Sequence, residues 1–137
     1  MRLDMTRRSD LAVRALWALG ANEERIKGSE LADLIDTTPA FLPQVLSPLV
    51  RRRWVDSTPG PNGGYLLAVD LDDVSLLDVI EAVEGPLDHD VCVLDGGHCT
   101  EVGHCAVHEA WTEARQQLYR RLDATPISRS NLRRDRN

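Results

Sequence analysis

The chain has 137 residues, of which 42% are hydrophobic and 28% are charged. This length suits one domain, or one small domain with an oligomerisation arm, and the composition supports a packed core under a solvated surface. No apolar run approaches the roughly eighteen residues that cross a bilayer, and no signal peptide precedes the first helix, so we expect a cytoplasmic protein without a membrane partner.

The net charge of −6 argues at first against a nucleic-acid partner, but the charges are unevenly distributed. The first 53 residues carry nine basic and seven acidic side chains, and basic residues return from Arg115 onward. Between Arg53 and Arg115 there is no Lys or Arg. Because DNA responds to a local basic face rather than to the average charge, the sequence is compatible with a double-stranded DNA partner.

Two helices are predicted in the first part of the chain. The first covers Asp10 to Ala21, where leucines recur at helical spacing after Ser9, the expected N-cap. The second covers Glu30 to Ile35, with Ser29 as its expected cap.

A third helix is predicted from Pro39 to about Arg53, with Thr38 as N-cap and proline at the first helical position. Two helices joined by a short turn form either a plain helical hairpin or a helix-turn-helix, whose second helix enters the major groove of DNA. Pro43 and Pro48 lie inside this helix, where a proline costs about 3 kcal/mol through a lost hydrogen bond and a clash. We therefore expect a kinked helix or two short pieces.

Two strand-like runs follow, Trp54 to Ser57 and Tyr65 to Val69, around the turn-forming segment TPGPNGG. A helix-turn-helix followed by a β-hairpin is the winged-helix arrangement, which favours DNA binding over a plain hairpin. Arg51, near the end of the third helix, suits the negative pole of that helix and a phosphate contact.

Ser75 and Asp78 resemble a capping box that opens a short helix, which Gly85 and Pro86 end. After Cys105 a long helix is predicted to about Leu122, and its apolar stripe favours pairing with a second copy of the chain. The expected fold is mainly α with a small β-hairpin wing. It divides into a winged helix-turn-helix DNA-binding domain (1–86), a ligand-binding loop (87–108), a dimerisation helix (105–125) and a flexible tail (126–137).

The loop holds all three cysteines, Cys92, Cys99 and Cys105, and His108 follows the last of them by three positions. Sulfur and imidazole donors among glycines are what a soft transition metal or an iron–sulfur cluster requires. The alternatives are structural zinc, a disulfide with a spare thiol, and simple packing. The polar neighbours of these cysteines are poor core material, which favours a metal or cluster site.

The segments SDLAVRAL, PGPNGGYLLA and VSLLDVIEAVEGP, followed by the three cysteines, together resemble the Rrf2 family of bacterial winged-helix regulators. The resemblance runs nearly end to end. It implies a homodimeric transcriptional regulator, expected to be a repressor and not an enzyme, that binds one iron–sulfur cluster per subunit through Cys92, Cys99 and Cys105.

The resemblance leaves two options for the fourth ligand. The spacing Cys-x-x-His-x-x-Trp at Cys105 is similar to the IscR branch, in which the histidine, here His108, binds a 2Fe–2S cluster. The run beginning at Ser9 is similar to the NsrR branch, in which the aspartate, here Asp10 of the partner subunit, binds a 4Fe–4S cluster. We favour His108 because its local match is longer.

The DNA contacts are expected at the start of the third helix and at the wing. The sequence departs from the family at Pro59, where a basic residue usually precedes the first glycine of the wing. The sequence does not identify the signal, which could be cluster status, iron, nitric oxide or redox state. Two alternative functions also stay open: a thiol- or zinc-based redox-sensing regulator, and a metal- or redox-carrying protein that does not bind DNA. The residues expected to touch DNA are Thr38, Ala40, Gln44, Arg51 and Asn62.

Overall fold

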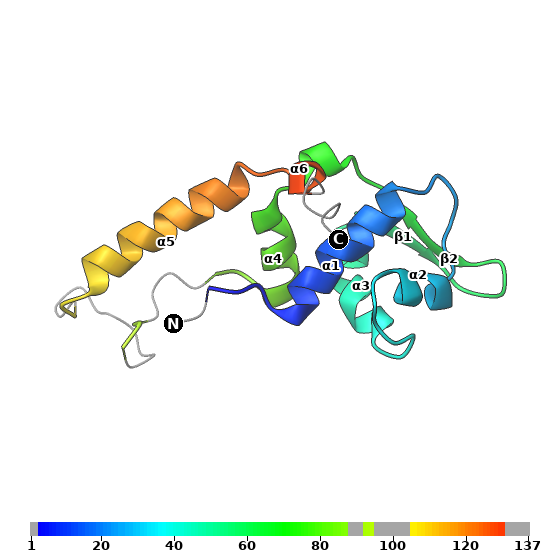
Figure 1. Cartoon of the computed structure of the whole chain (residues 1–137), viewed down its shortest axis with the longest axis horizontal. Coiled ribbons are helices and arrows are strands. Elements are labelled where there is room, and N and C mark those ends of the chain that lie inside the picture. The colour runs from blue at the N-terminus through cyan, green and yellow to red at the C-terminus, as the bar shows by residue number, and fades with distance from the viewer. Residues whose placement is uncertain (1–2, 88–91, 95–104, 131–137) are drawn as a thin grey trace, which may run out of the picture.

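The computed structural model describes residues 3–87, 92–94 and 105–130. Helices α1 to α4 and one β-hairpin form a rounded unit, which we call the body, and helix α5 (His108–Asp123) extends away from it as an arm (Figure 1). Among the described helices none is both long and apolar enough to cross a membrane.

Helix α1 (Arg7–Gly20) lies at the centre of the body and packs against α3 (Leu42–Arg51) and α4 (Leu76–Glu84) (Figure 1). Its apolar residues recur every three or four positions, so one broad face is covered by the other helices. Helix α2 (Gly28–Leu34) precedes α3 and completes the helix-turn-helix. The large aliphatic side chains that are fully buried on α1, α2 and α3 or at their ends include Leu11, Leu16, Leu19, Leu31, Ile35, Leu42, Val45, Leu46 and Leu49.

Two predicted helix caps were wrong. The N-cap of α1 is Thr6, whose Oγ1 accepts a hydrogen bond from the Ser9 backbone N–H at 3.2 Å. Ser9 is instead fully buried, and its hydroxyl donates to Glu84 Oε1 at 2.7 Å. Helix α2 starts after Lys27, without a side-chain cap, so Ser29 lies within its first turn. Ser9 is thus the third residue of α1 and Ser29 the second residue of α2.

Helix α3 begins at Leu42, three residues later than predicted. Thr38 starts a turn rather than the helix, and its Oγ1 accepts a hydrogen bond from the Phe41 N–H at 3.1 Å. Pro43 therefore occupies the second helical position, where no intrahelical N–H partner is needed. Only Pro48 is interior, and α3 continues through it as a single helix.

The wing consists of β1 (Val55–Thr58) and β2 (Gly64–Leu67), paired antiparallel. Ile26 joins its edge through two backbone hydrogen bonds with Tyr65, at 2.8 and 2.9 Å. Gly64 has φ +138° and passes so close to Ile26 that a Cβ would clash with the Ile26 carbonyl oxygen. This glycine thus lets the wing attach to the body.

A short 3₁₀ helix η1 (Leu71–Asp73) leads to α4, whose predicted capping box is confirmed. The Asp78 N–H donates to Ser75 Oγ at 3.0 Å, and the Ser75 N–H donates to Asp78 Oδ2 at 2.8 Å. At Gly85, which has φ +86°, the helix ends and the chain leaves toward the cysteine loop.

After α5 the chain returns to the body as the short helix α6 (Ile127–Ser130) (Figure 1). Ile127 is fully buried, its N–H donates to the Val74 carbonyl at 2.9 Å, and its carbonyl accepts from Trp17 Nε1 at 2.8 Å. The beginning of the segment that we expected to be a tail is therefore anchored, whereas residues 131–137 lie outside the described part of the chain.

Candidate nucleic-acid interface and cysteine site

The turn and the outer face of α3 form an exposed polar surface. Leu42, Val45, Leu46 and Leu49 turn inward and are buried, because they share the face that packs against α1 and α4. The opposite face leaves Gln44, Ser47 and Arg51 exposed to solvent. An amphipathic helix with a polar outer face after a tight turn is the geometry of a recognition helix.

The five residues expected to touch DNA are all exposed. Thr38 and Ala40 lie in the turn and Gln44 and Arg51 on α3, so the structure gathers these four around one helix. Asn62 lies apart, in the turn that joins the strands of the wing. Their contacts with bases or phosphates remain a prediction.

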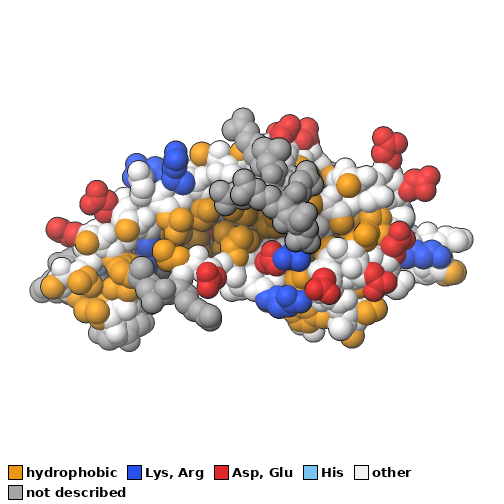
Figure 2. Space-filling view, in the orientation of Figure 1, with side chains coloured by type: hydrophobic (Ala, Val, Ile, Leu, Met, Phe, Trp, Pro, Cys, Tyr) orange, Lys and Arg blue, Asp and Glu red, His pale blue; other side chains and the backbone are white. Residues whose placement is uncertain are grey.

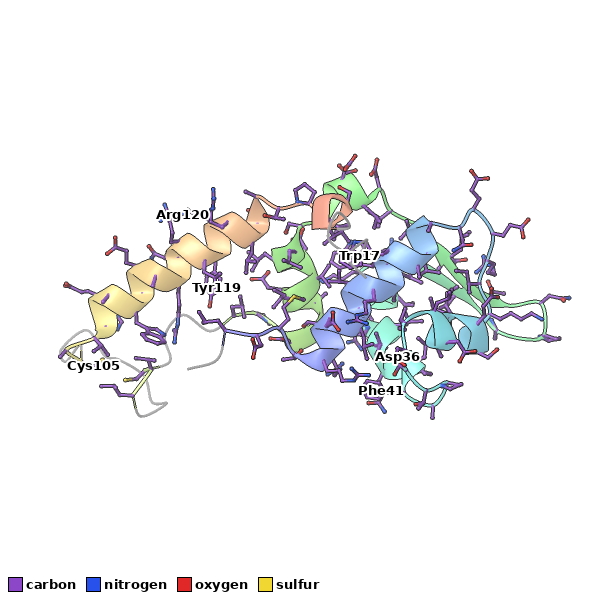
Figure 3. The ribbon with its side chains drawn as sticks, in the orientation of Figure 1. Trp17, Asp36, Phe41, Cys105, Tyr119 and Arg120 are labelled. Atoms are coloured by element: carbon purple, nitrogen blue, oxygen red, sulfur yellow. The ribbon has the colours of Figure 1, made fainter. Side chains whose placement is uncertain are left out.

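Two arginines at the start of α1 also belong to this surface, and the sequence analysis did not identify them. Arg7 Nη2 donates to the Asp36 carbonyl in the turn at 3.1 Å, and Arg8 Nη2 donates to the Gln44 carbonyl on α3 at 3.4 Å. Figure 3 places Asp36 and Phe41 beside the N-terminal half of α1. The only signal in the sequence was the pair of adjacent positive charges, which does not specify a contact.

Two basic residues near the wing, Arg25 and Arg52, already have protein partners. Arg25 Nη2 lies 2.6 Å from Asp56 Oδ2 and ties the loop before α2 to β1. The Arg52 guanidinium lies 5.7 Å from the ring centroid of Trp54. Pro59, which replaces the usual basic residue of the family, is exposed in the wing turn. Positive charge at this interface therefore comes mainly from the helices rather than from the wing tip.

The cysteine site lies at the far end of the arm (Figure 3). The Sγ atoms of Cys92 and Cys105 are 3.9 Å apart, and neither residue is in a disulfide. Cys92 is 8% exposed, and Cys105 is half-buried. Two thiolates on one tetrahedral metal centre with bonds of about 2.3 Å stand about 3.8 Å apart, so this separation fits two ligands of a shared metal.

The other proposed donors are divided between the arm and the body. Cys99 lies outside the described residues, and the described residues alone contain no group of three metal donors. His108 is the first residue of α5, and its N–H donates to the Cys105 carbonyl at 3.0 Å. Asp10 lies on α1 in the body, whereas Cys105 of the same chain lies at the far end of the arm (Figure 3). It faces Arg14 Nε at 2.9 Å, a charge contact without hydrogen-bond alignment.

Helix α5 keeps its apolar side chains accessible. No residue of α5 is buried, and Leu118 is 42% exposed. Figure 2 shows hydrophobic side chains along the arm and at its junction with the body. An open pocket between α4 and α5 is lined partly by Leu77 and Tyr119, and the Tyr119 side chain points to that side in Figure 3. Within the part of the chain that the structure describes, one apolar face of α5 thus stays largely accessible to solvent.

Glu84, the last residue of α4, connects the approach to the cysteine site with the start of α1. Its Oε1 accepts hydrogen bonds from the hydroxyls of Thr6 and Ser9, both at 2.7 Å. A carboxylate at a helix N-terminus is favoured by the helix dipole. The chain that leads to Cys92 therefore departs from a fixed point beside α1.

Two transcriptional regulators are similar to this chain in sequence. A protein of Aquifex aeolicus (strain VF5), described as an HTH-type transcriptional regulator, is 32% identical over 119 residues, which cover 85% of this chain and 83% of that protein. The HTH-type transcriptional regulator IscR of Klebsiella pneumoniae (strain 342) is 28% identical over 116 residues, or 83% of this chain and 71% of that protein.

Two solved structures share the fold. CymR, the global cysteine regulator of B. subtilis, has a TM-score of 0.72 at 24% identity, covering 93% of this chain and 95% of that chain. IscR of T. potens has a TM-score of 0.70 at 20% identity, covering 92% and 84%. Residues 5–129 match the Rrf2 family, described as iron-dependent transcriptional regulators. The chain therefore belongs to the Rrf2 family of winged helix-turn-helix transcriptional regulators, which are not enzymes.

Proposed function

We propose that this chain is a homodimeric, DNA-binding repressor whose affinity for its operator depends on an iron–sulfur cluster held by Cys92, Cys99, Cys105 and His108. The observation that carries the proposal is the 3.9 Å separation of the Cys92 and Cys105 Sγ atoms at the end of an arm joined to a helix-turn-helix body. The IscR relatives support the class of sensor, and the donor set suits iron.

The residues of the chain explain how such a site would communicate with the body. Cys92 lies eight positions after the last residue of α4, and Cys105 lies three positions before the first residue of α5. A shared ligand would therefore fix the start of α5 relative to the end of α4, while Glu84 holds that end against α1. When bound, the cluster would supply a redox-active centre that reacts with oxidants. In this proposal, the angle between α5 and the body takes one value with the ligand bound and another without it.

Dimerisation through α5 is part of the same proposal. The exposed apolar residues of α5 support a second copy of this helix as their cover, since a twofold dimer would present two recognition helices to a palindromic site. We assign DNA binding to residues 1–86, ligand binding to 87–108 and dimerisation to 105–125. Sedimentation of the purified protein should give twice the chain mass.

Anaerobic reconstitution with iron and sulfide tests the cluster directly. We expect a brown protein with visible absorption, which is lost when Cys92, Cys99 and Cys105 are replaced together by alanine. Replacing His108 by alanine should alter the spectrum, whereas His98→Ala serves as the control because His98 lies outside the Cys-x-x-His spacing. A colourless product from fully reduced protein contradicts the proposal.

A thiol switch without a metal is the second candidate. Thiols 3.9 Å apart need to approach by less than 2 Å to reach disulfide bonding distance. A solved structure of oxidised Staphylococcus aureus CymR, at 21% identity and TM-score 0.69, is similar to this chain. The two thiols would give two electrons and two protons to hydrogen peroxide, whose O–O bond breaks to give two water molecules as the Sγ–Sγ bond forms.

Measurements distinguish four alternatives: the iron–sulfur cluster, the thiol switch, a zinc site, and a carrier protein that does not bind DNA. Iron and sulfide in anaerobically purified protein support the cluster, and one zinc per chain supports a zinc site. Loss of two hydrogen masses on peroxide treatment of Cys99→Ser supports a Cys92–Cys105 disulfide. A gel shift with the DNA upstream of the gene, at two salt concentrations, separates all regulators from the carrier, which should not bind.

A further inference from the structure

Arg8 lies in the first turn of α1, an unfavourable place for a positive charge. The N-terminus of a helix carries a partial positive charge, so a cation there lowers the stability of the helix by a few tenths of a kcal/mol or more. Arg8 is exposed and has no carboxylate partner among the described residues. Its guanidinium donates to the Gln44 carbonyl instead.

That carbonyl is available because of Pro48. In a regular α-helix the Gln44 carbonyl would accept from the N–H of residue 48, four positions later, and proline has none. Arg8 Nη2 takes this place at 3.4 Å. The bond holds the guanidinium over the outer face of α3 and leaves most of the five N–H donors of Arg8 facing solvent.

Arg8 lines an open pocket with the recognition face of α3. Arg51 and Ser47 line the same pocket, and Arg51 Nη1 donates to Ser47 Oγ at 3.2 Å, which leaves the serine O–H as a donor. No acidic side chain lines the pocket; its lining residues are Arg8, Pro43, Gln44, Ser47, Pro48 and Arg51.

Arg7 provides an internal comparison. It lines a separate pocket with Thr37, Thr38 and Phe41, but that pocket also contains Asp36. An anion placed there would be repelled by the carboxylate, whereas an anion in the Arg8 pocket would meet two guanidinium groups and a hydroxyl.

We propose that Arg8, Ser47 and Arg51 bind a phosphodiester group of the DNA backbone at the edge of the groove that α3 enters, and that the proline-freed carbonyl of Gln44 positions Arg8 for this contact. The proposal rests on DNA binding by the helix-turn-helix. It gives α1 a role in binding that compensates for the missing basic residue at the wing.

The test is fluorescence anisotropy of full-length protein with a labelled, non-operator duplex of about 30 base pairs over a range of salt concentrations, because a phosphate contact does not depend on sequence. We expect R8Q to bind about fivefold more weakly near 100 mM salt, with the salt slope reduced by about 0.9. R7Q should lose less than about twofold, and R8K should keep the wild-type slope because it keeps the charge. R8Q should unfold at the wild-type temperature or slightly above it, so a folding defect is excluded.

Pro48→Ala tests the positioning. Alanine restores an N–H to the Gln44 carbonyl, so Arg8 loses its anchor and R8Q in this background should cost clearly less than in wild type. Equal costs in both backgrounds overturn the positioning role, and wild-type binding by R8Q overturns the phosphate site. If R7Q and R8Q weaken DNA binding equally, general attraction between positive charge and DNA explains the effect, and the specific phosphate site is overturned. If wild-type protein binds no DNA at low salt, the proposed function itself fails.

Discussion

The body and the arm differ in what stabilises them. In the body, α1 buries a broad apolar face against α3 and α4, and its leucines are almost completely excluded from solvent. The arm has no buried residue on α5, although its apolar side chains also recur at helical spacing. The same sequence pattern therefore gives a closed core in one region and an accessible surface in the other. Apolar residues that recur at helical spacing identify the apolar face of a helix, but only the tertiary structure shows whether the chain itself covers that face.

The two regions meet at a small joint. Ile127 inserts into the body after α5 ends, held by Trp17 Nε1 and the Val74 carbonyl. Nearby, the Leu76 N–H donates to the Thr125 carbonyl at 2.9 Å. One end of the arm is thus fixed by the body, and the other end carries Cys105.

The largest difference between the regions is expected from matched leucine truncations. Leu16→Ala, at a fully buried site, should lower the free energy of unfolding by about 4 kcal/mol, because it leaves a cavity in the body. Leu118→Ala, at a 42% exposed site on the arm, should lower it by less than about 1 kcal/mol at concentrations where the chain is monomeric. Urea denaturation measures both, and similar losses would contradict the distinction between body and arm.

The attachment of the wing to the body should be the next most sensitive feature. Gly64→Ala combines a positive φ with a clash against the Ile26 carbonyl, so we expect a loss of about 3 kcal/mol in stability. Gly60→Ala is the control, since Gly60 also has a positive φ but a Cβ there has no neighbour within 4 Å. It should cost only about 1 kcal/mol. Equal thermal shifts for the two variants would show that the Ile26 contact does not matter.

The joint is tested by Trp17→Phe, which removes the Nε1 donor to the Ile127 carbonyl. A buried acceptor without its donor costs about 1 to 2 kcal/mol, and amide exchange at Ile127 should accelerate more than at Leu16. Trp54→Phe is the matched control, because Trp54 contacts Arg52 through its ring. Unchanged exchange at Ile127 would mean that the arm is held elsewhere.

The smallest effect on stability is expected from Asp10→Asn. Asp10 is 40% exposed and its contact with Arg14 is a surface ion pair, so the loss should be about 0.5 kcal/mol or less. The D10N variant is informative because of the absorption spectrum of the reconstituted protein. If His108 is the fourth ligand, D10N keeps the wild-type spectrum, whereas a lost or shifted spectrum favours Asp10 of the partner subunit and a 4Fe–4S cluster.

Much of the body was predictable from local patterns. Apolar spacing located α1, α2 and α4, and turn residues located the wing, because these signals depend on neighbours a few positions apart. The capping box of Ser75 and Asp78 was predicted for the same reason. Helix starts were less reliable: at α1, Thr6 and Ser9 both resemble caps, and Ser9 is instead buried in a hydrogen bond with the distant residue Glu84.

The candidate site could be predicted only in part. The spacing of the cysteine loop names candidate donors, whose role stays a prediction, but it does not predict the 3.9 Å approach of Cys92 to Cys105. The bond from Arg8 to the Gln44 carbonyl joins residues 36 positions apart, and no periodic pattern reports it. Such long-range contacts form only when helices pack against each other, so they cannot be predicted from composition or from local residue spacing.

The sequence by itself determined the fold class, the helix-turn-helix with its wing, and the set of thiols available to a ligand, because each follows from short-range chemistry. Only the tertiary structure decided that Ile127 is buried while α5 is exposed, and that Arg8 reaches α3. The physical reason is that burial and side-chain contacts depend on which faces meet in space, and that is a property of the packed chain as a whole.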